Sequence, residues 1–481
     1  MSDATPVLFW FRRDLRLSDN PGLAAACRDG GPVVPVFLLD PETETLGAAA
    51  RWRLGRSLAD LGARLEAIGS RLILRRGPAA FTLEALAAET GARRVRWTRL
   101  YAPETVARDR QVKARLTAAA LGATSHPGHL LHEPWEVATG AGGAYRVFTP
   151  FWRAIARRGP DEPLPGIGRI PAPAAWPASD VLAEWRLGAG MDRGAAVVAR
   201  HAKIGEAAAA ARLAEFLEHR IGRYGRDRDR PDRDGTSGLS ENLTWGEISV
   251  RTVWHAARRA EAEGAAGATA FLRQLGWRDF AWHLIWHCPE IAERNWRAVW
   301  DDFPWRAENA EAERWRRGMT GEPMVDAGMR EMYVTGRMHN RVRMLVASYL
   351  TKHLMTHWRI GADWFAECLT DWDPASNAMG WQWVAGSGPD AAPFFRVFNP
   401  ALQAEKFDPE GAYRRRFVAE PAAGPPHADA RAYFEAVPRS WGLDPCAAYP
   451  EPLVDLKAGR RAALDAYRKH VAASAGGRAP A

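Results

Sequence analysis

The segment "LTDWDPASNAMGWQW", residues 369–383, places acids, an amide and indoles close together. Asp371 and Asp373 are two residues apart, Asn377 follows, and three tryptophans lie in the same fifteen residues. Paired carboxylates can bind a divalent metal, but no third carboxylate or histidine follows at ligand spacing, so we expect no metal here. General acid–base catalysis, or accepting hydrogen bonds from ribose hydroxyls or a ring N–H, remain as uses. The segment alone leaves both open.

A second segment, "GTSGLSENLTWGEIS" (235–249), gathers small hydroxyl residues in a turn. The hydroxyl residues are Thr236, Ser237 and Ser240. Hydroxyl donors and backbone N–H groups in one loop can bind a pyrophosphate. Thr244 and Glu247 are three residues apart, which predicts a capping box that opens the next helix. The alternative is a Ser/Thr turn that only caps a helix.

The segment "FLRQLGWRDFAWHLIWH" (271–287) carries two stripes at helical spacing. The apolar stripe, which predicts the buried face of a helix, consists of Phe271, Leu275, Trp282 and Trp286. The neighbouring stripe consists of Gln274, Trp277, Arg278 and Ala281. A core needs neither an arginine nor a glutamine, whereas these groups beside an indole suit a flat, hydrogen-bonding substrate such as a flipped base. The alternative is a boundary between surface and core.

The segment "TGRMHNRVRMLVASYLTKHL" (335–354) begins with polar residues and continues as an apolar helical pattern. His339 and Arg343 are four residues apart, and Asn340 and Arg343 are three apart, so the three side chains share one region of a helix. They either face a cofactor or form the hydrated end of that helix.

The elements that position these residues fall into three ranges. Residues 1–132 alternate short apolar runs such as "PVLFWF" and "PVVPVFLL" with stretches of helical spacing, which predicts βαβ units on a parallel, Rossmann-like sheet, although a GxGxxG fingerprint is absent. Residues 133–200 are rich in proline and glycine and predict a long linker with one helix at "TPFWRAIARR". Residues 201–475 carry almost no strand signal, so we expect an all-α second domain.

Within this second range four segments have the spacing of helices. They are 203–220, 245–263, 268–287 and 337–358. The run "GRYGRDRDRPDRDGT" alternates basic and acidic residues and predicts a solvated loop.

The composition of the 481 residues is that of a globular protein, with 47% apolar and 25% charged residues. No apolar run reaches the length of a membrane span. The N-terminus enters a strand-like run without a basic region and cleavage site, so we expect a cytoplasmic protein. Four cysteines lie far apart, which argues against a disulfide framework and a zinc site.

Charge and tryptophan content narrow the expected partners. The net charge is +8, and only six of the 65 basic residues are lysine. An arginine excess favours recognition of phosphates and planar groups, because guanidinium binds bidentately and stacks. The alternative is codon bias in a GC-rich genome. The 22 tryptophans are the stronger anomaly.

Together, and in this order, the segments resemble the DNA photolyase/cryptochrome family. "FWFRRDLRLSDNPGL" is similar to the family's opening strand and "GTSGLS" to its FAD phosphate loop. "QLGWRDF", "MHNRVRM", "DWDPASNAMGWQW" and "NPALQAEKFDP" resemble its flavin and DNA-contact motifs. The resemblance is closest to the bacterial class I cyclobutane pyrimidine dimer photolyases. It implies an antenna-type α/β domain followed by a helical domain that binds FAD and a DNA lesion.

The resemblance also implies roles for single residues, by motif match. FAD contacts are implied for Tyr224, Thr236, Ser237, Gly238, Leu239, Ser240, Phe271, Arg278, Asn340, Arg343, Asp371, Trp372, Asp373 and Asn377. Contacts to the flipped DNA lesion are implied for Gln274, Trp277, Arg278, Ala281, Asn340, Arg341, Met344, Trp383 and Gln403. The implied catalytic set is an electron relay through Trp381, Trp358 and Trp305, from the flavin to the surface, with Asn377 beside flavin N5.

The implied activity is light-driven: reduced FAD donates an electron to a cyclobutane pyrimidine dimer, the ring splits, and the electron returns. No acid or nucleophile is required. The implied partner is UV-damaged DNA, met by a monomer without an obligate protein partner, cytoplasmic and nucleoid-associated when bound to DNA. A second antenna chromophore, 5,10-methenyltetrahydrofolate or 8-hydroxy-5-deazaflavin, stays open, because "AAARWRLGRSLADL" lacks an aromatic and a histidine common in that segment.

Three departures keep rival functions in view. Gln274 stands where enzymes acting on cyclobutane dimers typically carry Glu and the (6-4) photoproduct photolyases carry Gln, but Asn340 stands where the (6-4) type has a second histidine. Arg337 replaces a frequent tryptophan. The first alternative function is thus a (6-4) photoproduct photolyase. A cryptochrome-type photoreceptor is a second alternative, disfavoured because the chain ends soon after the last motif. An ordinary flavin oxidoreductase is a third, for which no nicotinamide site is visible.

Overall fold

The computed structural model describes residues 5–391, 393–420 and 424–476. The chain forms two compact units, each assembled from several stretches. Unit 1 comprises Met1–Gly190, Lys203–Gly225 and Ser237–Pro289, and unit 2 comprises Met191–Ala202, Arg226–Thr236 and Glu290–Ala481. The three-part domain division expected from the sequence stays a prediction.

Unit 1 contains a five-stranded parallel sheet with the strand order β3-β2-β1-β4-β5. The strands are β1 (Val7–Phe11), β2 (Val33–Leu39), β3 (Ile73–Arg76), β4 (Arg94–Thr98) and β5 (Gly122–His126). In the register of the sheet, Val7 lies opposite Val33 on one side and Arg94 on the other. Every residue of β1 and β2 is buried, as in parallel strands covered on both faces. The predicted α/β class is confirmed.

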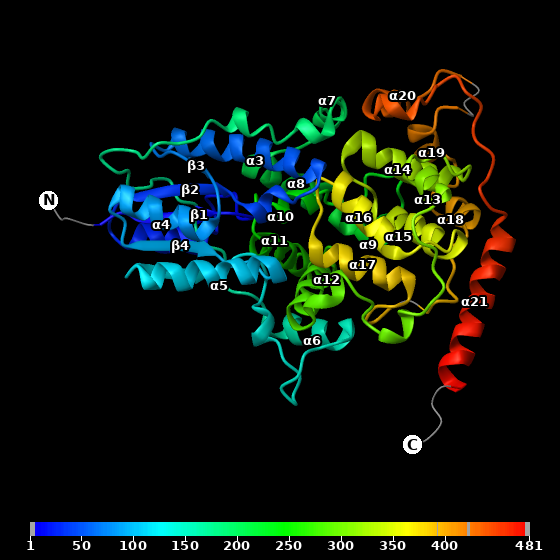
Figure 1. Cartoon of the computed structure of the whole chain (residues 1–481), viewed down its shortest axis with the longest axis horizontal. Coiled ribbons are helices and arrows are strands. Elements are labelled where there is room, and N and C mark those ends of the chain that lie inside the picture. The colour runs from blue at the N-terminus through cyan, green and yellow to red at the C-terminus, as the bar shows by residue number, and fades with distance from the viewer. Residues whose placement is uncertain (1–4, 392, 421–423, 477–481) are drawn as a thin grey trace. The chain divides into compact units, whose positions relative to one another are not determined.

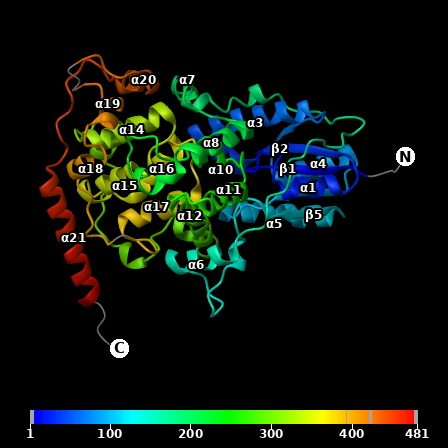
Figure 2. The same ribbon diagram turned by 180° about the vertical axis from the view of Figure 1, so that it is seen from behind.

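Helices cover both faces of this sheet because successive strand residues point to opposite sides. Phe9 and Phe37 pack with α1 (Pro21–Arg28) and α3 (Ala48–Ala67). Trp10 and Val36 pack on the other face with α4 (Ala79–Thr90) and α5 (Pro103–Ala118). Figure 1 shows α3, α4 and α5 along the strands, and Figure 2 shows α1 from behind.

A helical part of unit 1 forms a separate core. Its helices are α6 (Phe148–Arg158), α8 (Gly205–His219), α10 (Ser240–Thr244), α11 (Val250–Ala262) and α12 (Ala268–His287). Phe271 and Leu275 are buried in this core, and Trp282 is buried while Trp286 is half-buried. Gly276 lets α6 approach α12, since a Cβ there would lie 2.6 Å from the Trp152 ring. The predicted apolar stripe of residues 271–287 is therefore correct.

Unit 2 is helical, which confirms the expected all-α second half. Its helices are α7 (Gly194–Ala199), α13 (Ala310–Arg316), α14 (Pro323–Thr335), α15 (Asn340–Ser348), α16 (Trp358–Cys368), α17 (Pro374–Ala385), α18 (Pro400–Phe407), α19 (Ala412–Phe417), α20 (Ala428–Ala436) and α21 (Leu456–Gly476). Trp315, Trp358 and Trp381 belong to its main core. In the described ranges no helix is both long and apolar enough to span a membrane.

Short helical elements occur in both units. They are α2 (Pro41–Glu44), α9 (Tyr224–Asp227), η1 (Pro134–Glu136), η2 (Leu182–Trp185), η3 (Ala189–Met191), η4 (Ile221–Arg223), η5 (Pro289–Ala292), η6 (Ala298–Trp300), η7 (Tyr349–His353) and η8 (Arg439–Trp441).

The helix expected over 337–358 is shorter in the structure, where α15 continues without a break into the π-helical turn η7 and the helical run covers 340–353. α15 begins at Asn340, capped by His339, and α16 begins at Trp358, capped by His357. Between them, η7 is a π-helical turn, and Met355 has a positive φ of 50°. Each histidine accepts the backbone N–H two residues ahead, so the polar side chains that looked like part of one helix in fact start two.

Candidate functional site

Unit 1 places the second stripe of α12 at the edge of its helical core. Gln274, Trp277 and Arg278 are half-buried, whereas Ala281 is buried. One face of the Trp277 ring stacks on Phe148, with centroids 3.7 Å apart and planes within 10°. A second aromatic ring could therefore stack only on the opposite face of this indole.

The Arg278 side chain is fixed by backbone rather than by its acidic neighbour. Its guanidinium donates to the His129 carbonyl at 2.9 Å, while Asp279 Oδ1 is 3.7 Å away. Asp279 accepts from Leu131 N at 2.8 Å. Burial nevertheless raises the pKa of Asp279 to about 7, because the cost of desolvating the carboxylate exceeds the stabilisation that its hydrogen bonds provide.

The hydroxyl segment 236–240 is partly open. Thr236, Ser237 and Gly238 are half-buried and Ser240 is exposed, and Ser237 Oγ accepts the Leu239 N–H at 3.4 Å. Leu239 and Tyr224 are buried, and the Tyr224 ring meets Phe271 edge to face at 5.3 Å. The segment therefore offers hydroxyl groups beside an apolar wall.

The predicted capping box is wrong. Thr244 ends α10, and α11 is capped by Ser249, whose side chain accepts the Arg251 N–H. Glu247 is fully buried instead and accepts hydrogen bonds from Arg53, Ser57 and Asn242. Tertiary ion pairing has overridden the local signal for a cap.

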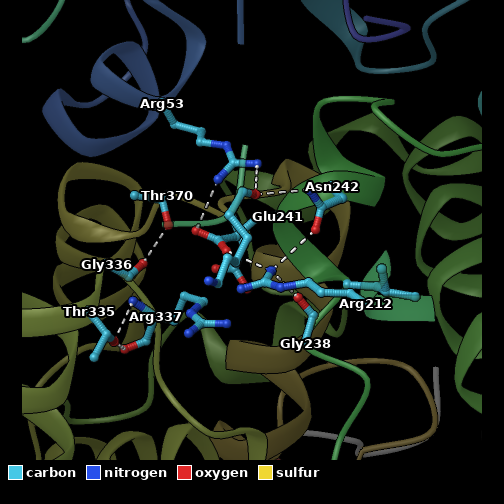
Figure 3. A network of polar contacts seen from close by, with 12 residues as sticks. Arg53, Arg212, Gly238, Glu241, Asn242, Thr335, Gly336, Arg337 and Thr370 are labelled. Carbon is cyan, nitrogen blue, oxygen red and sulfur yellow. Dashed lines mark hydrogen bonds and ion pairs between the residues drawn. The ribbon is translucent and has the colours of Figure 1, made fainter. Parts of the chain in front are cut away.

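This buried ion-pair network lies within unit 1. Arg53 Nη2 lies 2.5 Å from Glu247 Oε2, and Arg53 Nη1 lies 3.7 Å from Glu241 Oε1. Arg212 contacts Glu241 and the Gly238 carbonyl. Figure 3 shows Arg53, Glu241, Asn242 and Arg212 meeting in this network. A buried charge needs such partners, so these acids have a structural role.

In unit 2 the two predicted aspartates have different partners. Asp371 accepts from Arg343 Nη2 at 2.9 and 2.8 Å, and Arg343 Nε donates to the Met338 carbonyl. Asp373 caps α17 by accepting the Ser376 N–H at 2.7 Å. No cluster of three or more potential metal ligands occurs in the described part of the chain.

The amide of Asn377 has a fixed orientation. Its Nδ2 donates to the Ala362 carbonyl at 3.0 Å, and a carbonyl oxygen can only accept, so the amide oxygen must face the other way. Asn377 Oδ1 makes no hydrogen bond to another described residue, and the side chain is half-buried. An acceptor is thus available for a ring N–H.

The start of α15 is an N-cap with exposed neighbours. Burial lowers the pKa of His339 to about 4, so the imidazole is neutral at pH 7. Asn340 is exposed, and its amide lies 4.0 Å from Met344 Sδ. Upstream, the Gly336 carbonyl accepts from Thr370, which joins this segment to the start of the 369–383 segment (Figure 3).

The three relay tryptophans differ in how their indole N–H groups are satisfied. Trp358 donates to Asn295 Oδ1 at 2.9 Å, and Trp305 donates to the Thr351 carbonyl at 3.0 Å. Trp381 is 2% exposed, and its Nε1 has no hydrogen-bond partner among the described residues. The ring of His357 lies 5.3 Å from that of Trp305 and 5.6 Å from that of Trp358.

Gly361 makes room for Trp381. A Cβ at this position of α16 would lie 2.0 Å from Cη2 of the Trp381 ring. Trp372 lies just before α17 and Trp383 lies in its last turn, and both side chains are half-buried. The indoles of this segment therefore serve partly as core, and the buried Trp381 N–H has no hydrogen-bond partner among the described residues.

A basic cavity of about 470 Å³ lies in unit 2. Its lining residues are Arg226, Asp229, Arg230, Arg341, Arg396, Phe398, Gln403, Lys406 and Phe407. Arg341 pairs with Asp229 at 2.9 Å and stacks on Phe407. Five cations against one acid, with two aromatic rings, suit a polyanion that carries bases.

Sequence reasoning found two of the nine lining residues, Arg341 and Gln403. The arginines of 225–234 were not predicted as part of a binding site, because alternating basic and acidic residues are typical of a solvated loop. In the structure Asp227 is buried, and it pairs with Arg226 and Arg233. No local signal separates such a loop from a solvated one, since the arginines become a binding surface only through the fold.

Two family models match the chain. Residues 7–171 match the one described as DNA photolyase, and residues 271–469 match the FAD binding domain of DNA photolyase. The deoxyribodipyrimidine photo-lyase of Agrobacterium fabrum is 45% identical over 469 residues, which cover 96% of this chain and 97% of that protein. Cryptochrome-2 of Arabidopsis thaliana is 35% identical over 94% of this chain and 77% of that protein.

A solved structure is similar over almost the whole chain. The bacterial class III photolyase from Agrobacterium tumefaciens matches with a TM-score of 0.89 and 44% identity, over 98% of both chains. The expected closeness to the class I enzymes is therefore not supported. The wider resemblance, to a family whose members are named photo-lyases and cryptochromes, is confirmed.

Proposed function

The chain belongs to the DNA photolyase/cryptochrome family, and from this premise we propose that it is a photolyase. It uses light to split cyclobutane pyrimidine dimers in UV-damaged DNA, with FAD as cofactor. The observation that carries the repair function, rather than light sensing alone, is the basic cavity of unit 2 with Arg341 and Gln403 in its lining. A sensor that does not bind DNA has no use for five cations around one recess.

The residues present fit a flavin. Asn377 presents an amide oxygen to a ring N–H, because its nitrogen is already bonded to Ala362. Trp381 holds a buried indole N–H without a partner among the described residues, so this donor is available to a bound group. Arg343 and Asp371 form a half-open ion pair that can hold hydrogen-bonding edges of the cofactor. FAD, when bound and excited, supplies the electron that opens the dimer and takes it back afterwards.

The remaining flavin contacts are proposed from the motif match. They are Tyr224, Thr236, Ser237, Gly238, Leu239, Ser240, Phe271, Arg278, Asn340, Trp372 and Asp373. The hydroxyl groups of 236–240 suit the pyrophosphate. The chain's own task is to bind, to orient and to exclude water, since the reaction asks for no protein acid or nucleophile.

On the DNA side, we propose that the flipped dimer meets Gln274, Trp277 and Met344 as well as the cavity. Ala281 and Trp383 complete the proposed set. Trp277 has one ring face occupied by Phe148, so the dimer stacks on the other face. Gln274 can hydrogen-bond a thymine edge without a charge. Asn340 cannot donate the proton that the (6-4) chemistry needs, which favours the cyclobutane dimer as the substrate.

The proposed relay runs through Trp381, Trp358 and Trp305. Indole is oxidisable, and the half-buried Trp305 reaches solvent. The His357 ring beside both Trp305 and Trp358 closes the space between them. We also propose a cytoplasmic monomer without an obligate protein partner, found on the nucleoid when bound to DNA. Sedimentation velocity of the purified protein would give one species near 53.2 kDa.

The test is repair by the purified holoprotein. Chemically reduced protein is mixed with UV-irradiated oligothymidylate, illuminated with blue light, and the dimers are counted by chromatography against a dark control. Loss of dimers only in the light supports the proposal, and unchanged dimers with a photoreducible flavin would instead identify a light sensor. A (6-4)-containing oligonucleotide serves as the second substrate and should remain unrepaired.

An absorption spectrum before and after denaturation tests the cofactors. Release of FAD is expected. A second chromophore, 5,10-methenyltetrahydrofolate or 8-hydroxy-5-deazaflavin, would appear as an additional released spectrum. A protein that is colourless, and cannot be reconstituted with FAD, would contradict the proposed function.

A further inference from the structure

A buried lysine in unit 2 has a carbonyl group, not a carboxylate, as its partner. Lys352 is 1% exposed, and its ammonium donates to the Arg396 carbonyl at 2.9 Å. No carboxylate among the described residues pairs with it, and its Nζ lies 5.1 Å from the centre of the Phe394 ring. Burying an ammonium without a counter-ion is unfavourable. Packing alone therefore does not account for a lysine at this position.

The lysine is one of two anchors beneath a loop that lines the basic cavity. The loop is residues 393–399, just before α18. Lys352 holds the Arg396 carbonyl, and Ser348 Oγ accepts the Phe398 N–H at 3.2 Å. Ser348 and Lys352 are both buried, whereas the Arg396 side chain is exposed. The backbone is fixed from below at the two residues, Arg396 and Phe398, whose side chains line the cavity.

The anchor comes from an unusual turn. Lys352 belongs to η7, in which Leu354 N donates to Tyr349 O five residues earlier. π-helical turns of this kind occur frequently at functional sites. The same turn holds Trp305, because the Thr351 carbonyl accepts its indole N–H. Helix α21 packs against the turn, where Gly459 lies beside His353.

We propose that Lys352 is a positioning residue for DNA binding: its ammonium fixes the 393–399 loop so that Arg396 and Phe398 face the DNA backbone in the basic cavity. Lys352 itself does not touch the DNA. The inference rests on the proposed function, since it names UV-damaged DNA as the ligand of the cavity. A charge-assisted hydrogen bond to a carbonyl is stronger than a neutral one. This strength gives a reason for a lysine at a position where a neutral donor would have a lower desolvation cost.

The anchor has a pH dependence that a purely structural residue would not pass on to DNA binding. Burial, and secondarily the charge of the Arg396 guanidinium, lower the pKa of Lys352 to about 7. His353, the neighbouring titratable group, has its pKa lowered to about 4 by burial and stays neutral above pH 6. A DNA phosphate at Arg396 favours the charged lysine. Affinity for DNA should therefore be highest when Lys352 is protonated and fall as the pH rises from 6 to 9.

The experiment measures dark binding of the holoprotein to a fluorescent, UV-irradiated oligothymidylate between pH 6 and 9. Lys352→Met should bind about tenfold more weakly at pH 6, the equivalent of one charge-assisted contact, and its affinity should lose the wild-type decline with pH. Ser348→Ala should also bind more weakly but keep that decline. In repair assays Lys352→Met should raise KM and leave kcat unchanged, because the loop binds the substrate without taking part in the reaction.

Lys113→Met, on an exposed face of α5, is the matched control. It removes the same charge and should leave both affinity and pH profile as in the wild type. Wild-type affinity and pH profile in Lys352→Met would overturn the inference. If Lys352→Met does not fold, Ser348→Ala decides, and unchanged affinity in it would overturn the loop-anchoring role. Failure of the proposed function looks different: the wild type itself would show no preference for irradiated over unirradiated DNA at any pH.

Discussion

The segments 235–249 and 369–383 contain similar polar residues but differ in which polar atoms lack a partner. In the first, Glu241, Asn242 and Glu247 are fully buried and are bonded to Arg53, Ser57 and Arg212. In the second, the Trp381 indole N–H and the Asn377 amide oxygen have no partner among the described residues. A network of paired buried charges stabilises a fold, whereas a polar atom without a partner, beside residues that fit a cofactor, is available to a ligand.

Breaking the buried ion-pair network should have the largest effect on stability. Arg53→Met leaves two fully buried carboxylates without their shared cation, and the free energy of unfolding should fall by about 3–5 kcal/mol. Urea unfolding followed by circular dichroism measures it. Arg115→Met breaks a partly exposed pair with Glu84 and should change stability by less than about 1 kcal/mol. Equal effects of the two variants would mean that the network is not structural.

A second variant tests whether every buried carboxylate of unit 1 is equally well satisfied. Asp279 has its pKa raised to about 7 by burial, so the native state binds a proton that the unfolded state has lost above about pH 4. The contribution of the protonated Asp279 to the free energy of unfolding is fully present below pH 4 and is lost as the pH rises through 7. Asp279→Asn keeps an acceptor for Leu131 N and removes the charge, so it should equal the wild type at pH 4 and exceed its stability by about 2–4 kcal/mol at pH 8.

The measurement is urea unfolding at pH 4, 6 and 8. Asp465→Asn, at an exposed position of α21, should show no such trend. If Asp279→Asn were instead less stable than the wild type at pH 8, Asp279 would belong with the buried ion-pair network and its charge would be well compensated.

The partly open stripe of α12 lies between the two extremes. Trp277 is stacked on one face and available on the other, so Trp277→Ala should weaken binding to UV-damaged DNA by about 1–3 kcal/mol through lost base stacking. Fluorescence anisotropy in the dark measures this change. Trp135→Ala removes an exposed indole elsewhere in unit 1, and if it weakened binding to the same extent, the effect of Trp277 would not be specific.

The sequence predicts the elements of both segments better than the partners of their side chains. The parallel strands and the stripe of α12 follow from periodicity, because both patterns are local. Glu247 could not be predicted: three residues after Thr244 it has the spacing of a capping box, whereas its partners Arg53 and Ser57 lie 194 and 190 positions earlier in the chain. The helix expected over 337–358 was predicted too long at both ends, because His339 caps its start and a positive φ at Met355 follows its last turn.

The candidate site shows the same limit. Arg341 and Gln403 were found because they lie in motifs, whereas Arg226, Arg230 and Arg396 line the same cavity without any local signal. Their positions depend on loops whose path is set by long-range contacts such as Lys352 to Arg396. A family resemblance carries residue types forward, but it does not give the hydrogen-bond partner of each atom.

The two relay indoles Trp358 and Trp381 should differ in how much each contributes to stability. Trp358→Phe leaves Asn295 without its donor and should reduce stability by about 1–3 kcal/mol. Trp381→Phe removes an N–H that has no partner, so the loss of packing is largely offset and stability should change by less than about 1 kcal/mol. Photoreduction of oxidised FAD should nevertheless slow strongly in Trp381→Phe, while repair by pre-reduced protein stays close to that of the wild type. Equal loss of photoreduction and repair would contradict the relay, and a large loss of stability would place Trp381 with the structural polar groups of unit 1.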